Sequence, residues 1–387
     1  MGFQSQIQEA LTALERAGLR RSPPTIDGPQ GPVVRIAGRT VLCFCSNNYL
    51  GLAGHPAIRA AAQAALDQEG AGAGASRLIS GTMTAHGEAE AALAGFVGQP
   101  DAVLFSSGYA ANLGALQALV GPEDTVFSDA LNHASLIDGC RISRAEIHVY
   151  RHADLEHLEA LLASHRPKAR RALVLTDSLF SMDGDVAPLR GLAELARRYD
   201  AGLMVDEAHA LGVFGPEGRG LAAAEGVQPD LLVGTLGKSF GLAGAFVAAS
   251  ETMVTYLRNR ARSFVYSTAP PPMLARAALA ALSLVQGADD RRARLFRHAE
   301  RLRRELRDLG LDVPPGTGPI VPVIIGENRS TMQFSEALLN RGVFVQGIRP
   351  PTVAPGSARL RLTVMATHEE KQIVRAIEAF TEIIREG

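Results

Sequence analysis

The chain of 387 residues has few cysteines and almost no net charge, and each shortage excludes a class of protein. Cys43, Cys45 and Cys140 are too few and too unevenly spaced for a disulfide framework, and the first two have no partner pair for a zinc site. We expect buried, reduced thiols and no bound metal. The formal net charge is −1, with 39 basic and 40 acidic residues, so the chain lacks the basic footprint of a nucleic-acid-binding protein.

The sequence also lacks long apolar runs. No window approaches the roughly 20 apolar residues that cross a bilayer, and no basic region followed by an apolar signal core opens the chain. We therefore expect a cytoplasmic protein without a membrane partner. Arginine-rich stretches such as Asp289–Leu295 are typical of solvated helix faces.

Short apolar runs that alternate with alanine-rich helical patterns are, by contrast, frequent. This alternation predicts a mostly parallel sheet with helices on both faces. Because a domain typically has about 150 residues, the length of the chain favours two or three units. We expect an N-terminal helix and arm over 1–45, a large domain over 46–285 and a small C-terminal α/β domain over 286–387, without internal repeats. In the last part, the pattern predicts helices over Arg291–Leu306, Met332–Arg341 and Glu369–Ile384, and strands over Ile320–Ile325, Val343–Val345 and Ala358–Thr363.

Two apolar runs end in side chains with useful chemistry. Gly202–Val205 leads into Asp206, and Leu231–Gly234 leads to Lys238. Functional groups gather where buried parallel strands end, so both side chains could face one crevice. A buried carboxylate can keep a pyridine nitrogen protonated, and a lysine can form a Schiff base with an aldehyde and later act as a base. The pair predicts a site for pyridoxal 5'-phosphate (PLP).

Two further strand ends could complete such a site. Ala102–Phe105 leads into the glycine-containing turn Ser106–Asn112 and a helical pattern, so free backbone N–H groups at a helix N-terminus could hold a phosphate. Ala172–Leu175 leads into Thr176–Asp185, which is rich in hydroxyl and carboxylate groups.

Each of these signals also has an ordinary structural interpretation. An aspartate at a strand end is often a helix cap, a Gly-Lys-Ser triplet is often a surface turn, and a lone histidine such as His133 is more often structural. A nucleotide P-loop is excluded because the position five before Gly237 is Leu232, not glycine. The glycines of Gly70–Gly74 lack the strand context of a nicotinamide-binding motif.

Seven motifs in order along nearly the whole chain resemble the α-oxoamine synthase family of fold-type I PLP enzymes. This family resemblance implies an α/β fold with a large, mostly parallel sheet domain flanked by helices and a smaller C-terminal α/β domain. The alanines that separate the glycines of the second motif, Ala73 and Ala75, are a slight departure from the family pattern. The motifs are Ser46–Leu52, Gly72–Gly81, Ser107–Asn112, Asn132–Ser135, Phe180–Asp185, Asp206–His209 and Gly234–Lys238.

The resemblance assigns roles to catalytic and cofactor-binding residues. Lys238 matches the Schiff-base lysine and Asp206 the partner of the pyridine nitrogen. His209 matches the contact to the cofactor's phenolic oxygen, and His133 the histidine that stacks on the ring. The remaining matches are the phosphate turn at Gly108 and Tyr109, the phosphate ligand Thr235, the cofactor-face residue Ser181, and Ser267 and Thr268, which would reach the phosphate of a partner subunit.

Substrate contacts follow from the same resemblance. Arg361 lies where the family binds the amino-acid carboxylate, which a planar guanidinium can hold in bidentate fashion; the alternative is an ordinary strand-edge arginine. Thr352 would line an acyl channel and Arg21 would lie near the substrate entrance. Asn47 and His133 complete the expected substrate-binding set.

The segment Ile348–Val353 resembles family members that condense L-alanine with a pimeloyl thioester, carried by CoA or a carrier protein, with loss of carbon dioxide, in biotin biosynthesis. Sister enzymes that use glycine or serine, making 2-amino-3-oxobutyrate, 5-aminolevulinate or sphingoid bases, stay open. A non-catalytic PLP-fold module would usually have lost Lys238 or its partners. The family implies a homodimer with sites at the interface.

Overall fold

The computed structural model describes residues 2–386, which form two compact units. The sheet unit comprises Leu50–Ser181 and Asp185–Arg292, and the terminal unit comprises the described residues 2–49, 182–184 and 293–386. The N-terminal arm and the C-terminal segment thus belong to one unit. The division of the chain into an arm, a large domain and a small domain stays a prediction.

The sheet unit is built on seven strands in the order β4-β10-β9-β8-β7-β5-β6. The last five of that order run parallel, whereas β10 is antiparallel to both of its neighbours. The predicted mostly parallel sheet is therefore confirmed. The strands are β4 (Asp101–Phe105), β5 (Thr125–Asp129), β6 (Glu146–Tyr150), β7 (Ala172–Asp177), β8 (Gly202–Asp206), β9 (Leu231–Thr235) and β10 (Ala245–Ala249).

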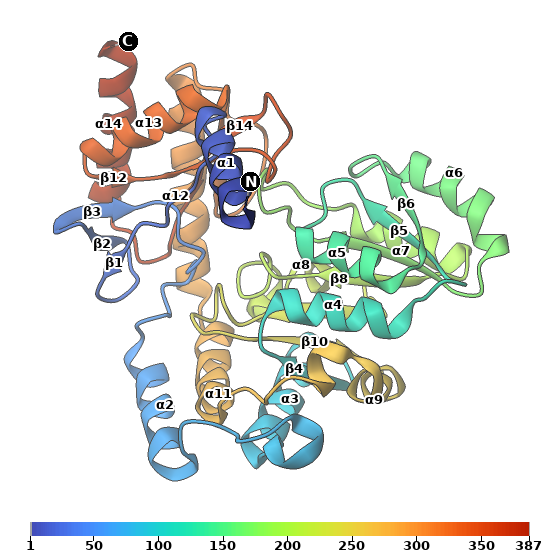
Figure 1. The fold of residues 1–387 in the computed structure, drawn as a ribbon. Coiled ribbons are helices and arrows are strands. Elements are labelled where there is room, and N and C mark those ends of the chain that lie inside the picture. Colours follow the sequence, from blue (N-terminus) through green and yellow to red (C-terminus); the bar gives the residue numbers. More distant parts are fainter. Residues whose placement is uncertain (1, 387) are drawn as a thin grey trace. The chain divides into compact units, whose positions relative to one another are not determined.

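Two hydrophobic cores cover the two faces of this sheet. On β10, Phe246 and Ala248 enter one core, while Ala245, Val247 and Ala249 enter the other, as the two-residue period of a strand requires. The first core includes α2 (Pro56–Glu69), α3 (Thr84–Val97) and α11 (Pro272–Gln286), which Figure 1 shows as neighbours. The second includes α4 (Gly108–Leu119), α5 (Ala134–Ser143), α9 (Glu251–Arg260) and α10 (Arg262–Val265).

The other described helices of this unit connect the strands. They are α6 (Leu155–His165), α7 (Leu189–Arg198) and α8 (Leu221–Glu225), with single helical turns at Arg77–Gly81, Arg166–Lys168 and Pro216–Gly218. On the strands that these two cores cover, most side chains are apolar, and polar groups collect where the strands end. The edge strand β6 is the exception, because only Tyr150 of its residues is buried.

The terminal unit holds two smaller sheets. One has the order β1-β2-β3-β12 and joins the two ends of the chain, because β12 pairs parallel with β3. The other is antiparallel, with the order β11-β14-β13. The strands are β1 (Ile26–Asp27), β2 (Val33–Ile36), β3 (Arg39–Cys43), β11 (Ile320–Gly326), β12 (Val343–Phe344), β13 (Gln346–Ile348) and β14 (Ala358–Thr363). The helices are α1 (Phe3–Arg16), α13 (Asn328–Asn340), α14 (Glu370–Glu386) and, from Ala293 onward, α12 (Asp289–Asp308).

Two expectations from the sequence need correction. The solvated helix face predicted for Asp289–Leu295 is wrong at Arg292, which is buried and donates to the carbonyl oxygen of Val285 at 2.7 Å. This carbonyl lies in the last turn of α11 and also accepts from the backbone N–H of Ala288 at 3.2 Å, so the guanidinium adds a further hydrogen bond at the helix end. The expected burial of the thiols holds for Cys43 and Cys140 but not for Cys45, which is only partly buried; all three are free.

A buried ion pair anchors the turn Arg77–Gly81 to the sheet. Arg77 donates to both carboxylate oxygens of Glu90 on α3, at 2.8 and 3.0 Å, and both side chains are 5% exposed. Glu90 also accepts from the backbone N–H of Leu104 on β4 at 2.9 Å. One carboxylate therefore connects the turn, a helix and a strand.

Arg77→Ala should lower the free energy of unfolding by about 3 kcal/mol, because it removes the guanidinium that binds both oxygens of buried Glu90 and leaves only Arg258, 3.6 Å from one of them. Urea unfolding followed by circular dichroism measures the change. Arg198→Ala is the control, since Arg198 pairs with Glu159 at 2.7 Å on the surface and such pairs contribute about 0–1 kcal/mol. Equal losses in the two variants would contradict the anchoring role of Glu90.

Candidate functional site

The carboxyl ends of the parallel strands meet at one edge of the sheet unit. Strand β5 ends at Asp129, β7 at Asp177, β8 at Asp206 and β9 at Thr235. Strand β4 runs in the same direction, because it is antiparallel to β10, and leads into α4 at Gly108. The candidate cofactor residues between 108 and 238 follow these ends.

Asp206 is held in place by two hydrogen bonds. Its side chain is buried; one oxygen accepts from the Asn112 side-chain amide at 2.7 Å, and the other accepts from the backbone N–H of Ala208 at 2.8 Å. The same Asn112 amide nitrogen also donates to Ser135 at 2.8 Å. The carboxylate is thus fixed in orientation, with acceptor positions still available.

Asn112 is a site residue to which the sequence analysis gave no role, although it closes the motif Ser107–Asn112. Its carbonyl oxygen is buried and has no hydrogen-bond partner within the described chain. A buried acceptor without a donor, next to Asp206, indicates a site that can bind a further polar group.

His133 lies in the field of Lys238 and Asp206. Burial lowers the pKa of the His133 imidazole, although the residue keeps an exposed edge; the Asp206 carboxylate opposes this shift, and the Lys238 cation adds to it. The ring is therefore neutral at neutral pH. The Nδ1 atom of His133 lies 2.7 Å from the Ser135 hydroxyl, and its backbone N–H donates to Asp177 at 2.6 Å.

Asp177 is a second buried carboxyl group at this edge, and sequence reasoning placed it only within Thr176–Asp185. Burial raises the pKa of Asp177 well above its ordinary value, and the nearby Asp206 carboxylate raises it further. Lys238 opposes the shift. Two neighbouring carboxyl groups do not both ionise readily, so Asp177 retains a proton more readily than an ordinary aspartate.

The predicted phosphate residues lie together at the end of β9. Thr235 accepts from the backbone N–H of Gly237 at 3.2 Å, and a methyl group added at Gly108 would stand 4.0 Å from the Thr235 Cβ atom. Ser107 caps α4 by accepting from the N–H of Ala110 at 3.1 Å. Tyr109 is half-exposed and donates its hydroxyl to Asp138 at 2.5 Å. Free N–H groups of the first helical turn therefore adjoin the Thr235 hydroxyl.

Other predicted cofactor residues lie in the same unit. His209 is buried three residues after the end of β8, and Ser181 follows β7. Thr268 forms an isolated antiparallel bridge with Ser76, which places Ser267 and Thr268 beside the motif Gly72–Gly81.

The predicted substrate residues form two pairs in the terminal unit. Arg361 is buried on β14, the middle strand of its sheet, and donates to the Asn47 side-chain oxygen at 3.2 Å. Its interpretation as a strand-edge arginine is therefore wrong. Arg21 donates to the Thr352 hydroxyl at 3.3 Å, which connects the segment after α1 to the segment before β14.

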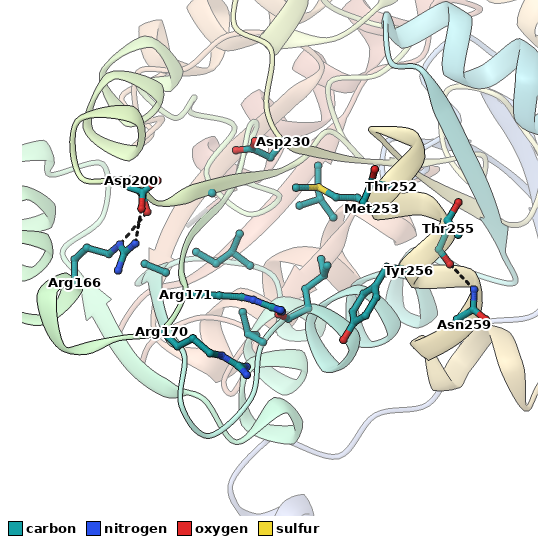
Figure 2. Close-up of a pocket in the computed structure, with 16 residues that line it drawn as sticks. Arg166, Arg170, Arg171, Asp200, Asp230, Thr252, Met253, Thr255, Tyr256 and Asn259 are labelled. Carbon is teal, nitrogen blue, oxygen red and sulfur yellow. Dashed lines mark hydrogen bonds and ion pairs between the residues drawn. The ribbon is translucent and has the colours of Figure 1, made fainter.

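A cavity of about 660 Å³ lies at the opposite edge of the sheet. The first residues of β7, β8 and β9 line it, together with α9 residues such as Met253 and Tyr256; Figure 2 shows the latter opposite Arg171. None of the predicted site residues lines this cavity, so its size does not make it the candidate site.

The model of the family described as aminotransferase class I and II matches residues 39–380. The chain belongs to this family. It is 51% identical to the 8-amino-7-oxononanoate synthase of Anaeromyxobacter dehalogenans strain 2CP-1 over 376 residues, which cover 97% of this chain and 94% of the relative. It is also 51% identical to the Geobacter sulfurreducens synthase of the same name, with 97% of each chain covered.

Solved structures with the same fold include two kinds of enzyme. The serine palmitoyltransferase of Sphingomonas wittichii matches with a TM-score of 0.93 at 33% identity, covering 99% of this chain and 97% of that one. A S. paucimobilis serine palmitoyltransferase variant with bound PLP–myriocin aldimine matches with a TM-score of 0.94 at 32% identity, covering 100% and 99%. The 8-amino-7-oxononanoate synthase of Francisella tularensis matches with a TM-score of 0.78 at 28% identity, covering 89% and 98%.

Among the described residues, no helix is both long and apolar enough to span a membrane.

Glu207, the neighbour of Asp206, fixes the segment that follows. It is fully buried and accepts from the backbone N–H groups of Leu221 and Ala222, at 3.1 and 2.6 Å, and from Ser178 at 2.9 Å. A methyl group on Gly220 would approach its carboxylate to 2.7 Å. Burial raises the pKa of Glu207 from 4.5 to about 7, against these three donors. The sequence analysis had named Glu207 only as part of a motif.

This shift predicts a pH-dependent stability. Between pH 4.5 and about 7 the folded chain holds the Glu207 proton more tightly than the unfolded chain, so this group's contribution to stability falls as pH rises through that window. The loss is of the order of 3 kcal/mol. The free energy of unfolding, measured with urea, should fall between pH 5 and pH 8, and it should fall less for Glu207→Gln than for the unchanged chain. An equal fall in the two proteins would contradict the raised pKa of Glu207.

Proposed function

We propose that this chain is a PLP-dependent acyltransferase of biotin biosynthesis. It condenses L-alanine with a pimeloyl thioester to give 8-amino-7-oxononanoate, carbon dioxide and the free thiol. The observation that carries the proposal is the identity of about one half, along nearly the whole chain, to relatives named 8-amino-7-oxononanoate synthase. The carboxylate, lysine and histidine at adjacent strand ends support it.

The residues at the carboxyl edge of the sheet unit fit PLP. A fixed, buried carboxylate with free acceptor positions suits a protonated ring nitrogen, and the first turn of α4 beside Thr235 suits a phosphate. When bound, PLP supplies an electron sink that stabilises negative charge on the amino acid's α-carbon. The protein must orient the substrate and move its protons.

Each catalytic side chain has one task in this proposal. Asp206 holds the proton on the pyridine nitrogen, and its hydrogen bond to Asn112 prevents it from turning away. Lys238 would hold the cofactor's aldehyde and, when free, would remove and return the α-proton of L-alanine. His133 presents a neutral ring for stacking, while His209 contacts the phenolic oxygen and Ser181 lies at the cofactor face.

The cofactor phosphate and the substrate have separate sets of residues. Backbone N–H groups of Gly108 and Tyr109 and the hydroxyl of Thr235 bind the phosphate, joined by Ser267 and Thr268 of a partner subunit. Arg361, with Asn47 as its hydrogen-bond partner, binds the alanine carboxylate. Thr352 and Arg21 line the path of the acyl chain.

Assembly and acyl carrier belong to the same proposal. We expect a homodimer in the cytoplasm that accepts pimeloyl-CoA or pimeloyl-carrier protein, as the family resemblance implies. A serine-using synthase is the second candidate, because the serine palmitoyltransferase of S. wittichii has a TM-score of 0.93, against 0.78 for the synthase of F. tularensis. The greater sequence identity to synthases, 51% against 33%, favours the first candidate.

The experiment that tests the proposal compares amino acids. Purified, PLP-loaded protein is incubated with pimeloyl-CoA and, in parallel, L-alanine, glycine or L-serine, and products are identified by mass spectrometry. Alanine-dependent 8-amino-7-oxononanoate is the expected result. Product with glycine or serine alone would reassign the chain to a sister synthase, and the absence of product with both CoA and carrier-protein thioesters would overturn the proposal.

Asp206→Ala should reduce kcat by about 10²–10³-fold, because an unpaired charged ring in a buried site costs about 3–5 kcal/mol. Lys238→Ala should abolish turnover and the visible absorption of imine-bound PLP. Asp200→Asn, in an aspartate whose side chain is 96% exposed, is the control and should retain activity. An Asp206→Ala enzyme with unchanged kcat and bound PLP would refute the assignment.

Arg361→Gln should raise KM for L-alanine by about 10–100-fold, because a hydrogen bond to a charged group contributes about 1.5–3 kcal/mol. KM for the acyl thioester should change little. Arg359→Gln is a control on the same strand, since Arg359 already pairs with Asp183. Initial rates measured at several L-alanine concentrations give KM for each variant. Equal increases in KM for Arg361→Gln and Arg359→Gln would point to a general disturbance of β14.

A further inference from the structure

Three potential metal ligands meet at the outer edge of the sheet unit. Glu146 and His148 lie two residues apart on β6, so their side chains share one face of the strand. Strand β6 is at the edge of the seven-stranded sheet, and α6 returns alongside it before β7 begins. The last residue of α6, His165, thereby comes back to the start of β6.

The donor atoms of these three side chains have the spacing of a metal site. His148 Nε2 lies 3.0 Å and His165 Nδ1 lies 3.7 Å from the same Glu146 oxygen, and all three donor atoms lie within 4.8 Å of one another. Zinc bonds of about 2.0–2.1 Å in a tetrahedron place ligand atoms about 3.3 Å apart. The two measured distances bracket that value.

The two imidazole rings lie together beside Glu146. Their centroids are 3.7 Å apart with the planes at 36°, and one nitrogen of each ring lies near the same Glu146 oxygen. His148 Nε2 is shielded from solvent and has no hydrogen bond of acceptable geometry within the described chain, despite its closeness to Glu146. A buried histidine nitrogen that lacks a hydrogen bond and lies beside a carboxylate oxygen is placed as a metal ligand would be.

The surroundings hold the site in shape and leave one side open. His148 faces Phe127 across the paired strands β5 and β6, and the rings stack at 5.7 Å, which limits rotation of the imidazole. The Glu146 side chain is 58% exposed, so a ligand position faces water. Two histidines, a carboxylate and a solvent molecule form a common zinc coordination set.

We propose that Glu146, His148 and His165 bind one divalent transition-metal ion of the zinc class, with water as a fourth ligand. The site lies at the amino end of β6, whereas the candidate catalytic residues follow the carboxyl ends of the strands. The ion connects the end of α6 to the edge strand and stabilises the fold. This proposal is independent of the chain's activity.

Zn²⁺ binding to the PLP-loaded protein, freed of metal by chelation and dialysis, tests the proposal by isothermal titration calorimetry. We expect about one equivalent bound, and at least about tenfold weaker affinity for Glu146→Gln and His165→Gln, since even outer-shell partners of metal ligands change affinity by about 10–100-fold. His157→Gln is the control on the same helix; His157 instead accepts from the N–H of Arg151 at 2.9 Å.

Thermal unfolding supplies a second measurement. Saturating Zn²⁺ should raise the midpoint of the unchanged chain and of His157→Gln, because an ion that binds only the folded state stabilises it. The two ligand variants should gain much less. The proposal would be overturned if no Zn²⁺ bound, or if the unchanged chain and the three variants bound it equally. Equal binding would mean that the ion binds other groups, such as those around Lys238.

Discussion

Burial of the seven-stranded sheet on both faces constrains everything else in the sheet unit. The covered strands carry apolar side chains in both directions, as the alternation along β10 shows, and leave little room for chemistry along their length. The edge strand β6, most of which is accessible to solvent, carries Glu146 and His148 instead. Charged and hydrogen-bonding groups collect at the strand ends. Because five strands run parallel, the ends that meet carry Asp129, Asp177, Asp206 and Thr235, and the segments after them converge on one crevice edge.

At that edge the charged groups depend on a layer of neutral partners. Asn112 orients Asp206 and also binds Ser135, while Ser135 lies against the ring of His133. The backbone of His133 in turn binds Asp177. This chain of contacts crosses from α4 to β8, α5 and β7, so the position of one carboxylate is set by four elements. A site with such support keeps its geometry without help from a ligand.

Local pattern was sufficient to predict β4, β7, β8 and β9, because each is a short apolar run that leads into polar residues, and the mostly parallel order followed from the helices between the strands. It did not single out β6, whose sequence mixes polar and apolar residues, or the antiparallel β10. Asp206 and Lys238 could be predicted as a site because they end adjacent strands. Asn112, Asp177 and Glu207 could not be given roles, since their importance arises from partners 44 or 94 positions away or from donors at the start of α8. Arg292 was misjudged for a related reason: its periodicity indicates a solvated helix, but the carbonyl groups of Val285 and Gln286 at the end of α11 accept from its guanidinium.

The pairing of β3 with β12 makes the terminal unit late to assemble. Leu42 pairs with Val343, so during synthesis the first strands wait until most of the chain has left the ribosome, while every residue of the sheet unit from Leu50 onward has already been made. In that interval β3 presents an unsatisfied edge, which other chains can extend. Chains that stop before Val343 keep this edge permanently, and their solubility should depend on chaperones that shield it.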